Sequence, residues 1–222
     1  MRAYYNDNNP TNAEWLRALM SEGLLPDGEI DDRSIANVSP ADLAGFDRCH
    51  FFAGIGGWQY ALDLARWPDD RPVWTGSCPC QPFSVAGKGG GADDERHLWP
   101  ELQRLISECR PSIALGEQVA SKAGREWWWD VQTDLEGMGY AGASSDLCAA
   151  SIGAPHIRQR LFFGAVALEP GGLGDSFGAG FLAALCTGAT LPDAASSAMQ
   201  LAAQVIQSRG ALVPAIFEGE RP

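Results

Sequence analysis

One cysteine stands between two prolines, in the segment Pro79-Cys80-Gln81-Pro82-Phe83-Ser84. Each proline fixes its own φ, so the backbone around the thiol has few conformations available. A restrained thiol at the end of a strand suits a nucleophile, provided that its surroundings favour the thiolate. The alternative is a buried cysteine that packs as a small apolar side chain, which is the usual role of a free thiol. The segment alone leaves both interpretations open.

A glycine-rich turn, Phe52-Ala53-Gly54-Ile55-Gly56-Gly57, stands between a short apolar run and a helical pattern. Glycines let the backbone approach a ligand closely, and the helix N-terminus that follows favours polar or anionic groups. A turn that merely packs the helix against its strand is an equally good explanation. The glycine motif by itself is therefore a weak indication of a cofactor loop.

Composition limits the classes of protein to consider. The chain has 222 residues and a net charge of −12, with a pI near 4.6. This length allows one large domain or two small ones. An acidic surface argues against a general nucleic-acid coat, although a narrow basic cleft stays compatible with it. No apolar run is long enough for a membrane span and no secretory signal is visible, so we expect a cytoplasmic protein without membrane contact.

The six cysteines do not follow the spacing of a disulfide framework or of a zinc site. Cys78 and Cys80 are separated by one residue, and no second pair follows at ligand spacing. We therefore expect reduced thiols and no bound metal.

Apolar patterning predicts alternating strands and helices, which is typical of a doubly wound α/β domain. We expect strands at 3–5, 49–52, 72–75, 112–115, 140–147 and 157–167, and helices at 58–67, 98–109 and 127–135. The composition shifts near residue 168, and two Ala-rich helices are expected at 178–186 and 194–207.

The cysteine segment and the glycine turn together resemble the DNA (cytosine-5) methyltransferase family. Gly116-Glu117-Gln118-Val119 is similar to that family's Glu-Asn-Val motif, with Gln in place of Asn. Pro155-His156-Ile157-Arg158-Gln159-Arg160 is similar to its Gln-x-Arg-x-Arg motif, with His156 at the Gln position. The four motifs follow the family's order over residues 51–163.

The resemblance implies a Rossmann-like sheet that binds S-adenosyl-L-methionine at the glycine turn. The cofactor contacts it implies are Phe52, Ala53, Gly54, Ile55, Gly56, Gly57 and Pro79. The implied substrate is double-stranded DNA with the target cytosine flipped out of the stack. The implied activity is DNA methylation of the restriction–modification type.

The same resemblance assigns the catalytic roles. Cys80, as thiolate, would attack C6 of the cytosine, and Glu117 would protonate or hydrogen-bond N3. Arg158 and Arg160 would hold the base and favour the thiolate. Because they are two residues apart, we expect both arginines on the same face of one strand.

The family places an acidic, ribose-binding strand after the glycine turn, yet here the chain leads almost directly to the Cys80 segment. We expect residues 1–45 to supply the missing strands, so that the order is permuted within a catalytic domain over 1–167. Asp7 would then contact the ribose and Asp31 the adenine. A solvated turn is the alternative for both carboxylates.

No target-recognition region of the family is recognisable after residue 160. Instead residues 171–213 resemble the C-terminal part of ribokinase-like (PfkB) sugar kinases, with Asp175 at the position of the catalytic base. Residues 168–222 are thus expected to form a helical add-on rather than a DNA-reading lobe. The alternatives to an active methyltransferase are an incomplete chain that binds the cofactor without reading DNA, a need for a partner chain that supplies recognition, or a sugar-kinase-like activity.

Overall fold

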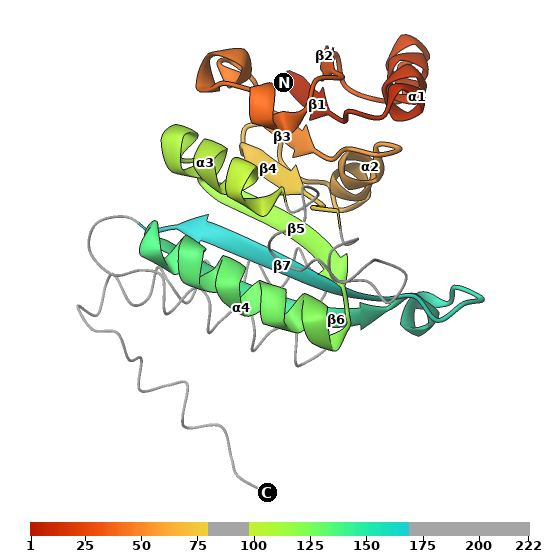
Figure 1. Cartoon of the computed structure of the whole chain (residues 1–222). Coiled ribbons are helices and arrows are strands. Elements are labelled where there is room, and N and C mark those ends of the chain that lie inside the picture. Colours follow the sequence, from red (N-terminus) through yellow and green to blue (C-terminus); the bar gives the residue numbers. More distant parts are fainter. Residues whose placement is uncertain (80–97, 169–222) are drawn as a thin grey trace, which may run out of the picture.

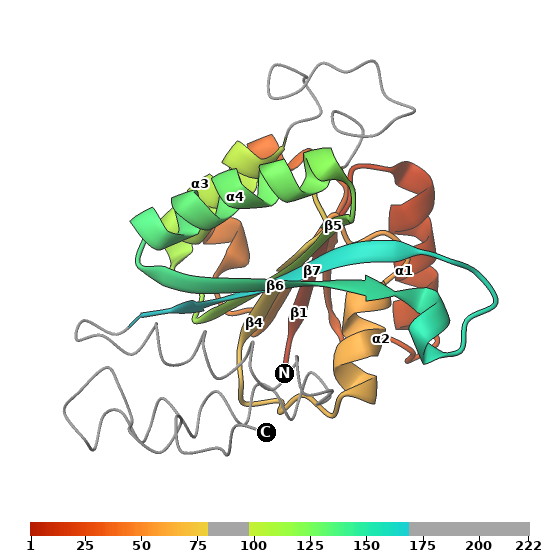
Figure 2. The ribbon, with the colours of Figure 1, turned by 90° about the horizontal axis from the view of Figure 1, so that it is seen from below.

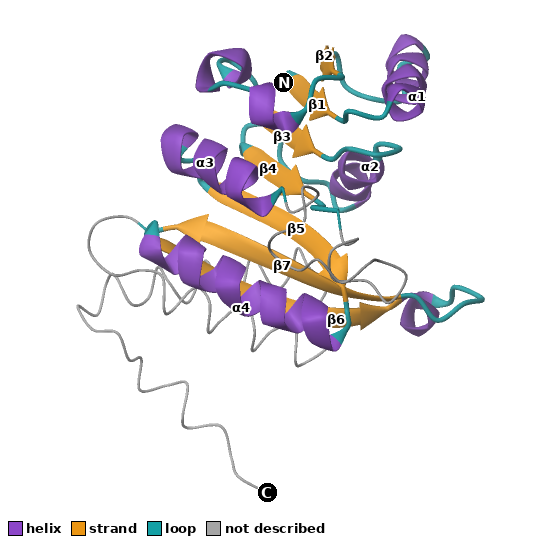
Figure 3. Cartoon of the chain, viewed as in Figure 1, coloured by secondary structure: helices purple, strands orange, loops and turns teal. Residues whose placement is uncertain are grey.

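The structure of the chain is a computed structural model that describes residues 1–79 and 98–168. These residues form a seven-stranded sheet with helices packed on its faces (Figure 1, Figure 3). The helices expected at 178–186 and 194–207 lie outside the described residues. None of the helices in the described ranges is long and apolar enough to cross a membrane.

The sheet mixes parallel and antiparallel strands. Its spatial order is β2-β1-β3-β4-β5-β7-β6. The five strands from β2 to β5 are parallel, whereas β7 runs antiparallel to both of its neighbours. The strands are β1 (Ala3–Asn6), β2 (Gly28–Asp31), β3 (Arg48–Phe51), β4 (Val73–Gly76), β5 (Ile113–Val119), β6 (Tyr140–Cys148) and β7 (Gln159–Ala167). This arrangement confirms the predicted α/β class and Rossmann-like sheet.

The two N-terminal strands, β1 and β2, lie at one end of the sheet, on the side of β3 that faces away from β4. Tyr5 of β1 pairs with His50 of β3 on one side and with Ile30 of β2 on the other. The strand that enters the glycine turn is therefore the third in the chain but sits between β1 and β4. Residues 1–45 thus supply two strands of the sheet, since strand neighbours need not be sequential, and their permutation relative to the family stays a prediction.

Four α-helices cover the sheet: α1 (Pro10–Ser21), α2 (Gly57–Leu64), α3 (Trp99–Cys109) and α4 (Lys122–Gly137). Figure 2 shows α3 and α4 together on one face, with α1 and α2 on the other. Asn9 caps α1 by accepting from the Thr11 N–H, and Ser121 caps α4 by accepting from the Gly124 N–H. The helix expected at 127–135 thus begins five residues earlier, at this serine cap.

Adjacent residues of β1 enter different hydrophobic cores, because successive side chains of a strand point to opposite faces. Tyr4 joins the large core beneath α3 and α4. Tyr5 packs with Leu16 of α1 and Ala53 of the glycine turn. Short 3-10 turns at Ile35–Asn37 and Pro40–Leu43 add Ile35 and Leu43 to the large core. The N-terminal strands are thus fully integrated into the domain.

A buried polar network lies under α2. The His50 ring places Nδ1 2.8 Å from Thr75 Oγ1 and Nε2 3.1 Å from Gln59 Oε1. Gln59 donates to Asp63, which also accepts from the buried Arg48. Burial lowers the pKa of His50 to about 4, so the ring is neutral near pH 7. Its two nitrogens are then satisfied by uncharged partners.

Acidification is expected to destabilise the domain through His50. The ordinary pKa of 6.5 applies to the unfolded chain, whereas burial lowers the folded value to about 4. The unfolded chain therefore binds the proton first, and the stabilisation present above pH 6.5 is lost as the pH falls toward 4. The expected slope is roughly 1 kcal/mol per pH unit. Urea unfolding across this pH range should show a shallower dependence for His50→Gln, while the exposed-site control His156→Gln should follow the wild-type curve. Parallel curves for His50→Gln and wild type would refute the assignment.

Candidate active site

The glycine turn is held against the end of β1 by backbone hydrogen bonds. The Ala53 N–H donates to the Asn6 carbonyl and the Gly56 N–H to the Ala53 carbonyl, both at 3.0 Å. Gly54 and Gly56 have φ values of 56° and 82°, in the left-handed region that glycine adopts without a steric penalty. Phe52 shares this region at φ 53° despite its side chain. The turn therefore has a fixed shape at the carboxyl end of β3.

Asp7 connects the first strand to this turn. The carboxylate is largely buried, and its Oδ2 accepts from the Gly54 N–H at 2.7 Å. Its Oδ1 accepts from the Asn9 N–H at 3.0 Å and from Asn12 Nδ2 at 3.1 Å. An ionised carboxylate has about four acceptor positions. Three are used within the chain, which leaves room for a further donor such as a ribose hydroxyl.

The Asp31 carboxylate accepts hydrogen bonds from other side chains of the protein. It accepts from the Tyr4 hydroxyl at 2.5 Å and from Arg33 Nη2 at 2.6 Å, and Arg33 also pairs with Asp42. Burial opposes ionisation of Asp31, but the hydrogen bonds from Arg33 and Tyr4 outweigh it and hold the carboxyl pKa below its usual value. This geometry favours a structural role at the end of β2. The contact with adenine stays a prediction.

Two of the predicted catalytic side chains meet directly. Arg160 Nε lies 2.5 Å from Glu117 Oε1, and the two side chains are 21% and 22% exposed. Glu117 stands within β5, which continues to Val119 instead of ending before the glutamate as the sequence suggested. Arg160 comes from β7, whose antiparallel pairing sets Phe162 opposite Glu117. A carboxylate and a guanidinium are thus paired at the carboxyl end of β5.

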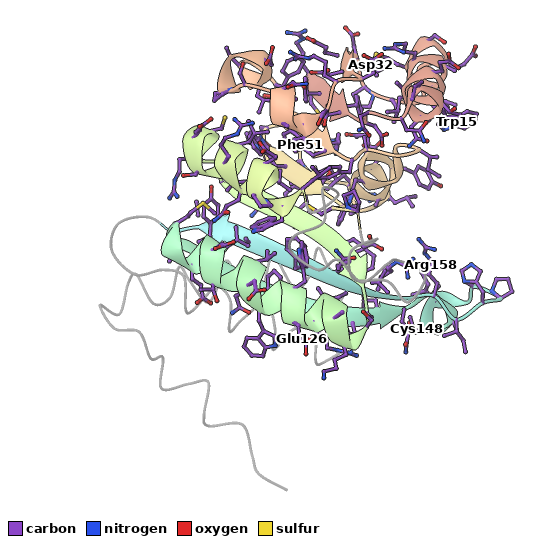
Figure 4. All side chains as sticks on the ribbon, in the orientation of Figure 1. Trp15, Asp32, Phe51, Glu126, Cys148 and Arg158 are labelled. Atoms are coloured by element: carbon purple, nitrogen blue, oxygen red, sulfur yellow. The ribbon has the colours of Figure 1, made fainter. Side chains whose placement is uncertain are left out.

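The expectation that Arg158 and Arg160 share one face of a strand is wrong. β7 begins at Gln159, and Arg158 belongs to the loop before it, where its carbonyl accepts from the Ala149 N–H at 3.0 Å. Alternation along a strand therefore does not apply to this pair. Figure 4 shows Arg158 where the chain enters β7. Its side chain is exposed and makes no ion pair within residues 1–79 and 98–168.

Cys80 lies outside the described residues, as does the glycine-rich stretch 87–91. The chain leading to Cys80 leaves β4 at Gly76, at the same sheet edge as the ends of β1, β3 and β5. Ligand sites of open α/β sheets form at this carboxyl edge. Pro79 is half-buried there. The neighbouring Cys78 is buried, and burial raises the pKa of its thiol to about 12, which makes it a poor nucleophile.

Sequence reasoning missed Trp58 in the first turn of α2. Its Nε1–H donates to Ser77 Oγ at 2.9 Å. Its ring meets the Phe162 ring edge-on, with centroids 6.0 Å apart. Trp58 therefore touches both the segment that leads to Cys80 and the strand that pairs with β5. Only its place next to the glycine turn could have drawn attention to it.

Residues 67–169 match the family model described as C-5 cytosine-specific DNA methylase. The Type II methyltransferase M.NgoMIV of Neisseria gonorrhoeae is 36% identical over 104 residues, which cover 46% of this chain and 33% of that protein. M.AplI of Arthrospira platensis is 34% identical over 106 residues, which cover 47% of this chain and 30% of that protein. These matches support the predicted family for this part of the chain. The chain spans about a third of the length of these curated relatives.

Solved structures with a related arrangement are more distant. Dnmt2 methyltransferase of S. pombe aligns with a TM-score of 0.43 at 16% identity, covering 78% of this chain and 52% of that one. The methyltransferase EhMeth of Entamoeba histolytica gives 0.42 at 12% identity, with coverage of 76% and 53%. The resemblance of residues 171–213 to sugar kinases is not supported by the family match, which ends at residue 169. Asp175 lies outside the described residues.

The contact between Trp58 and Ser77 is expected to stabilise the fold modestly. Trp58→Phe keeps the ring against Phe162 but removes the donor, and Ser77→Ala removes the acceptor. Each change should lower the free energy of unfolding by about 1 kcal/mol, and the double variant should lose much less than the sum. Urea unfolding of the four proteins measures this coupling. Strict additivity would show that the hydrogen bond does not contribute.

Proposed function

We propose that the chain carries the catalytic part of a DNA (cytosine-5) methyltransferase. The Glu117–Arg160 pair supports this proposal most directly. Glu117 lies on β5, the neighbour of β4, and the chain leads from β4 to Cys80. Each of these residues belongs to a motif within the segment that matches the cytosine-specific methylase family model. A segment that leads to a candidate nucleophile and a carboxylate–guanidinium pair lie at one sheet edge, which suits chemistry on a flipped base.

The aromatic ring of cytosine is a poor carbon nucleophile until its conjugation is broken. In the proposed mechanism the Cys80 thiolate forms a bond to C6, and the ring electrons move toward C5 and N3. Glu117 in its protonated form donates a proton or a hydrogen bond to N3 from the oxygen that is not paired with Arg160, which stabilises the charge that develops there. C5 then takes the methyl group. Water then takes the C5 proton, the C5–C6 double bond re-forms as the bond between Cys80 and C6 breaks, and the N3 proton returns to Glu117.

Arg160 orients the carboxylate in this scheme. A charge-assisted hydrogen bond at 2.5 Å fixes Glu117 in one rotamer at the end of β5. Its guanidinium also places a positive charge near the base, which favours the Cys80 thiolate. Arg158 lies outside the strand, and we assign it to the DNA side of the site instead of to the base.

S-adenosyl-L-methionine would supply the methyl group when bound. The described residues fit this cofactor at two points: the fixed backbone of turn 52–57 and the spare acceptor position of Asp7. Pro79 would border the pocket from the β4 side. The parallel strands β1, β2 and β3 bring these groups to the same sheet edge, which is the usual ligand edge of such folds.

We infer that the substrate is double-stranded DNA with a flipped cytosine, in a restriction–modification setting in the cytoplasm. Because the chain spans about a third of the relatives it matches, base reading is proposed to depend on a further region or a partner chain. Specificity requires side chains at base edges as well as contacts to phosphate. The second candidate is accordingly a catalytic domain of 1–167 that binds the cofactor without reading DNA.

Transfer of labelled methyl from S-adenosyl-L-methionine to mixed genomic DNA tests the activity. Incorporation should be abolished by Cys80→Ser and retained by Cys109→Ala, which changes a cysteine at the far end of α3. Binding of the cofactor in calorimetry without incorporation would favour the second candidate. Incorporation that survives Cys80→Ser would overturn the proposed mechanism.

Asp7→Asn is expected to weaken cofactor binding about tenfold, because a neutral amide is a weaker partner for ribose hydroxyls than a carboxylate. The matched control is Asp32→Asn, since Asp32 follows β2, is 55% exposed and pairs with Arg17. Calorimetric titration of each folded variant with S-adenosyl-L-methionine gives the comparison. Equal affinities for Asp7→Asn and Asp32→Asn would contradict the ribose assignment.

A further inference from the structure

The loop between β6 and β7 is an ordered projection. We call residues 148–158 the β6–β7 arm. At its base the Ala149 N–H donates to the Arg158 carbonyl at 3.0 Å, and inside it the Ala154 N–H donates to the Ala149 carbonyl at 3.1 Å. Gly153, at φ 89°, reverses the chain after a short 3-10 turn. The arm extends beyond the helices that cover the sheet (Figure 1).

The arm presents large aliphatic side chains to solvent. Ile152 is 87% exposed and Ile157 is 82% exposed, which makes them the two most exposed large hydrophobic residues in the described ranges. Single exposed apolar residues are ordinary on a protein surface. Two on one short arm, whose backbone is hydrogen-bonded to itself, form an apolar tip that lies outside every core cluster of the described residues.

The charge around this tip is opposite to that of the chain. The net charge is −12, yet residues 147–168 contain Arg158, Arg160 and His156 and no aspartate or glutamate. The carboxylate nearest in sequence, Asp146, is neutralised by Arg125 at 2.8 Å. The Arg158 side chain makes no ion pair within residues 1–79 and 98–168. The arm thus combines an exposed apolar tip with an arginine that has no ion pair in the described residues. These two features are complementary to a polymer that has anionic groups on its outside and an apolar interior.

Duplex DNA has this combination of a phosphate backbone and stacked bases. Proteins that distort DNA often insert aliphatic side chains between base steps, while arginines contact the adjacent phosphates. The arm ends two residues before Arg160, which pairs with Glu117. An arm in this position could contact the duplex next to a base that has left the stack.

We propose that the β6–β7 arm is a DNA-contacting element, with Ile152 and Ile157 packed against the bases and Arg158 on a phosphate. This inference rests on the proposed function, because it takes the substrate to be duplex DNA. It also gives Arg158 a different role from that of Arg160.

Binding of the full chain to a fluorescein-labelled duplex, followed by anisotropy over a range of salt, tests the arm. The double variant Ile152→Ser with Ile157→Ser should weaken binding at least tenfold at every salt concentration. Arg158→Ala should reduce the slope of log affinity against log salt by about one, as expected for one lost phosphate contact. The control is Leu24→Ser, because Leu24 is 67% exposed in the loop after α1.

The outcomes separate the arm from the proposed function. Unchanged affinity and slope in the arm variants, with clear binding by wild type, would overturn the arm and leave the DNA substrate intact. Absence of binding by the wild-type chain would overturn both. A change of oligomeric state on sedimentation in the serine double variant, without a change in DNA affinity, would assign the arm to contacts between protein chains and refute the proposal.

Discussion

The hydrogen bond between the Asp7 carboxylate and the Gly54 N–H joins the end of β1 to the glycine turn, at the sheet edge where we propose that the cofactor binds. Asp7 and Gly54 are 47 residues apart in sequence, yet parallel pairing of β1 with β3 brings the carboxyl ends of the two strands together. A permuted chain can form the same edge because the geometry depends on which strands pair and not on their order in sequence. If this pairing were lost, neither the turn nor the carboxylate would be in position.

The Glu117–Arg160 pair depends on a different constraint, the antiparallel insertion of β7 between β5 and β6. Its register sets Arg160 beside the end of β5, and alternation then directs Leu161 and Phe163 into the core beneath α3 and α4. A shift by one residue would exchange these faces, bury the guanidinium and expose two core side chains. The hydrophobic face of β7 thus fixes the position of the Glu117–Arg160 pair.

Local patterns predicted much of this arrangement. The glycines of turn 52–57 and the apolar runs of the strands are contiguous in sequence, whereas the segment around Cys80 lies outside the described residues. The fate of Asp31 was not predictable, since its partner Tyr4 is 27 residues away and meets it only because β1 and β2 pair. Trp58 and Ser77 are likewise distant in sequence, 19 residues apart, and their contact arises only from the fold. The start of β7 was misjudged by two residues, which is enough to remove Arg158 from the strand.

Because Arg158 lies outside β7 and Arg160 lies within it, the two arginines have different surroundings. Within β7, the Arg160 guanidinium forms an ion pair with Glu117, so its charge is paired inside the site. Outside the strand, Arg158 is exposed and its charge is available to solvent or to an anionic partner. In an acidic chain, a cation that has no ion pair within residues 1–79 and 98–168 changes the local potential more than it would on a basic surface. The start of β7 therefore separates Arg160, which is paired with the Glu117 carboxylate, from Arg158, whose side chain is exposed.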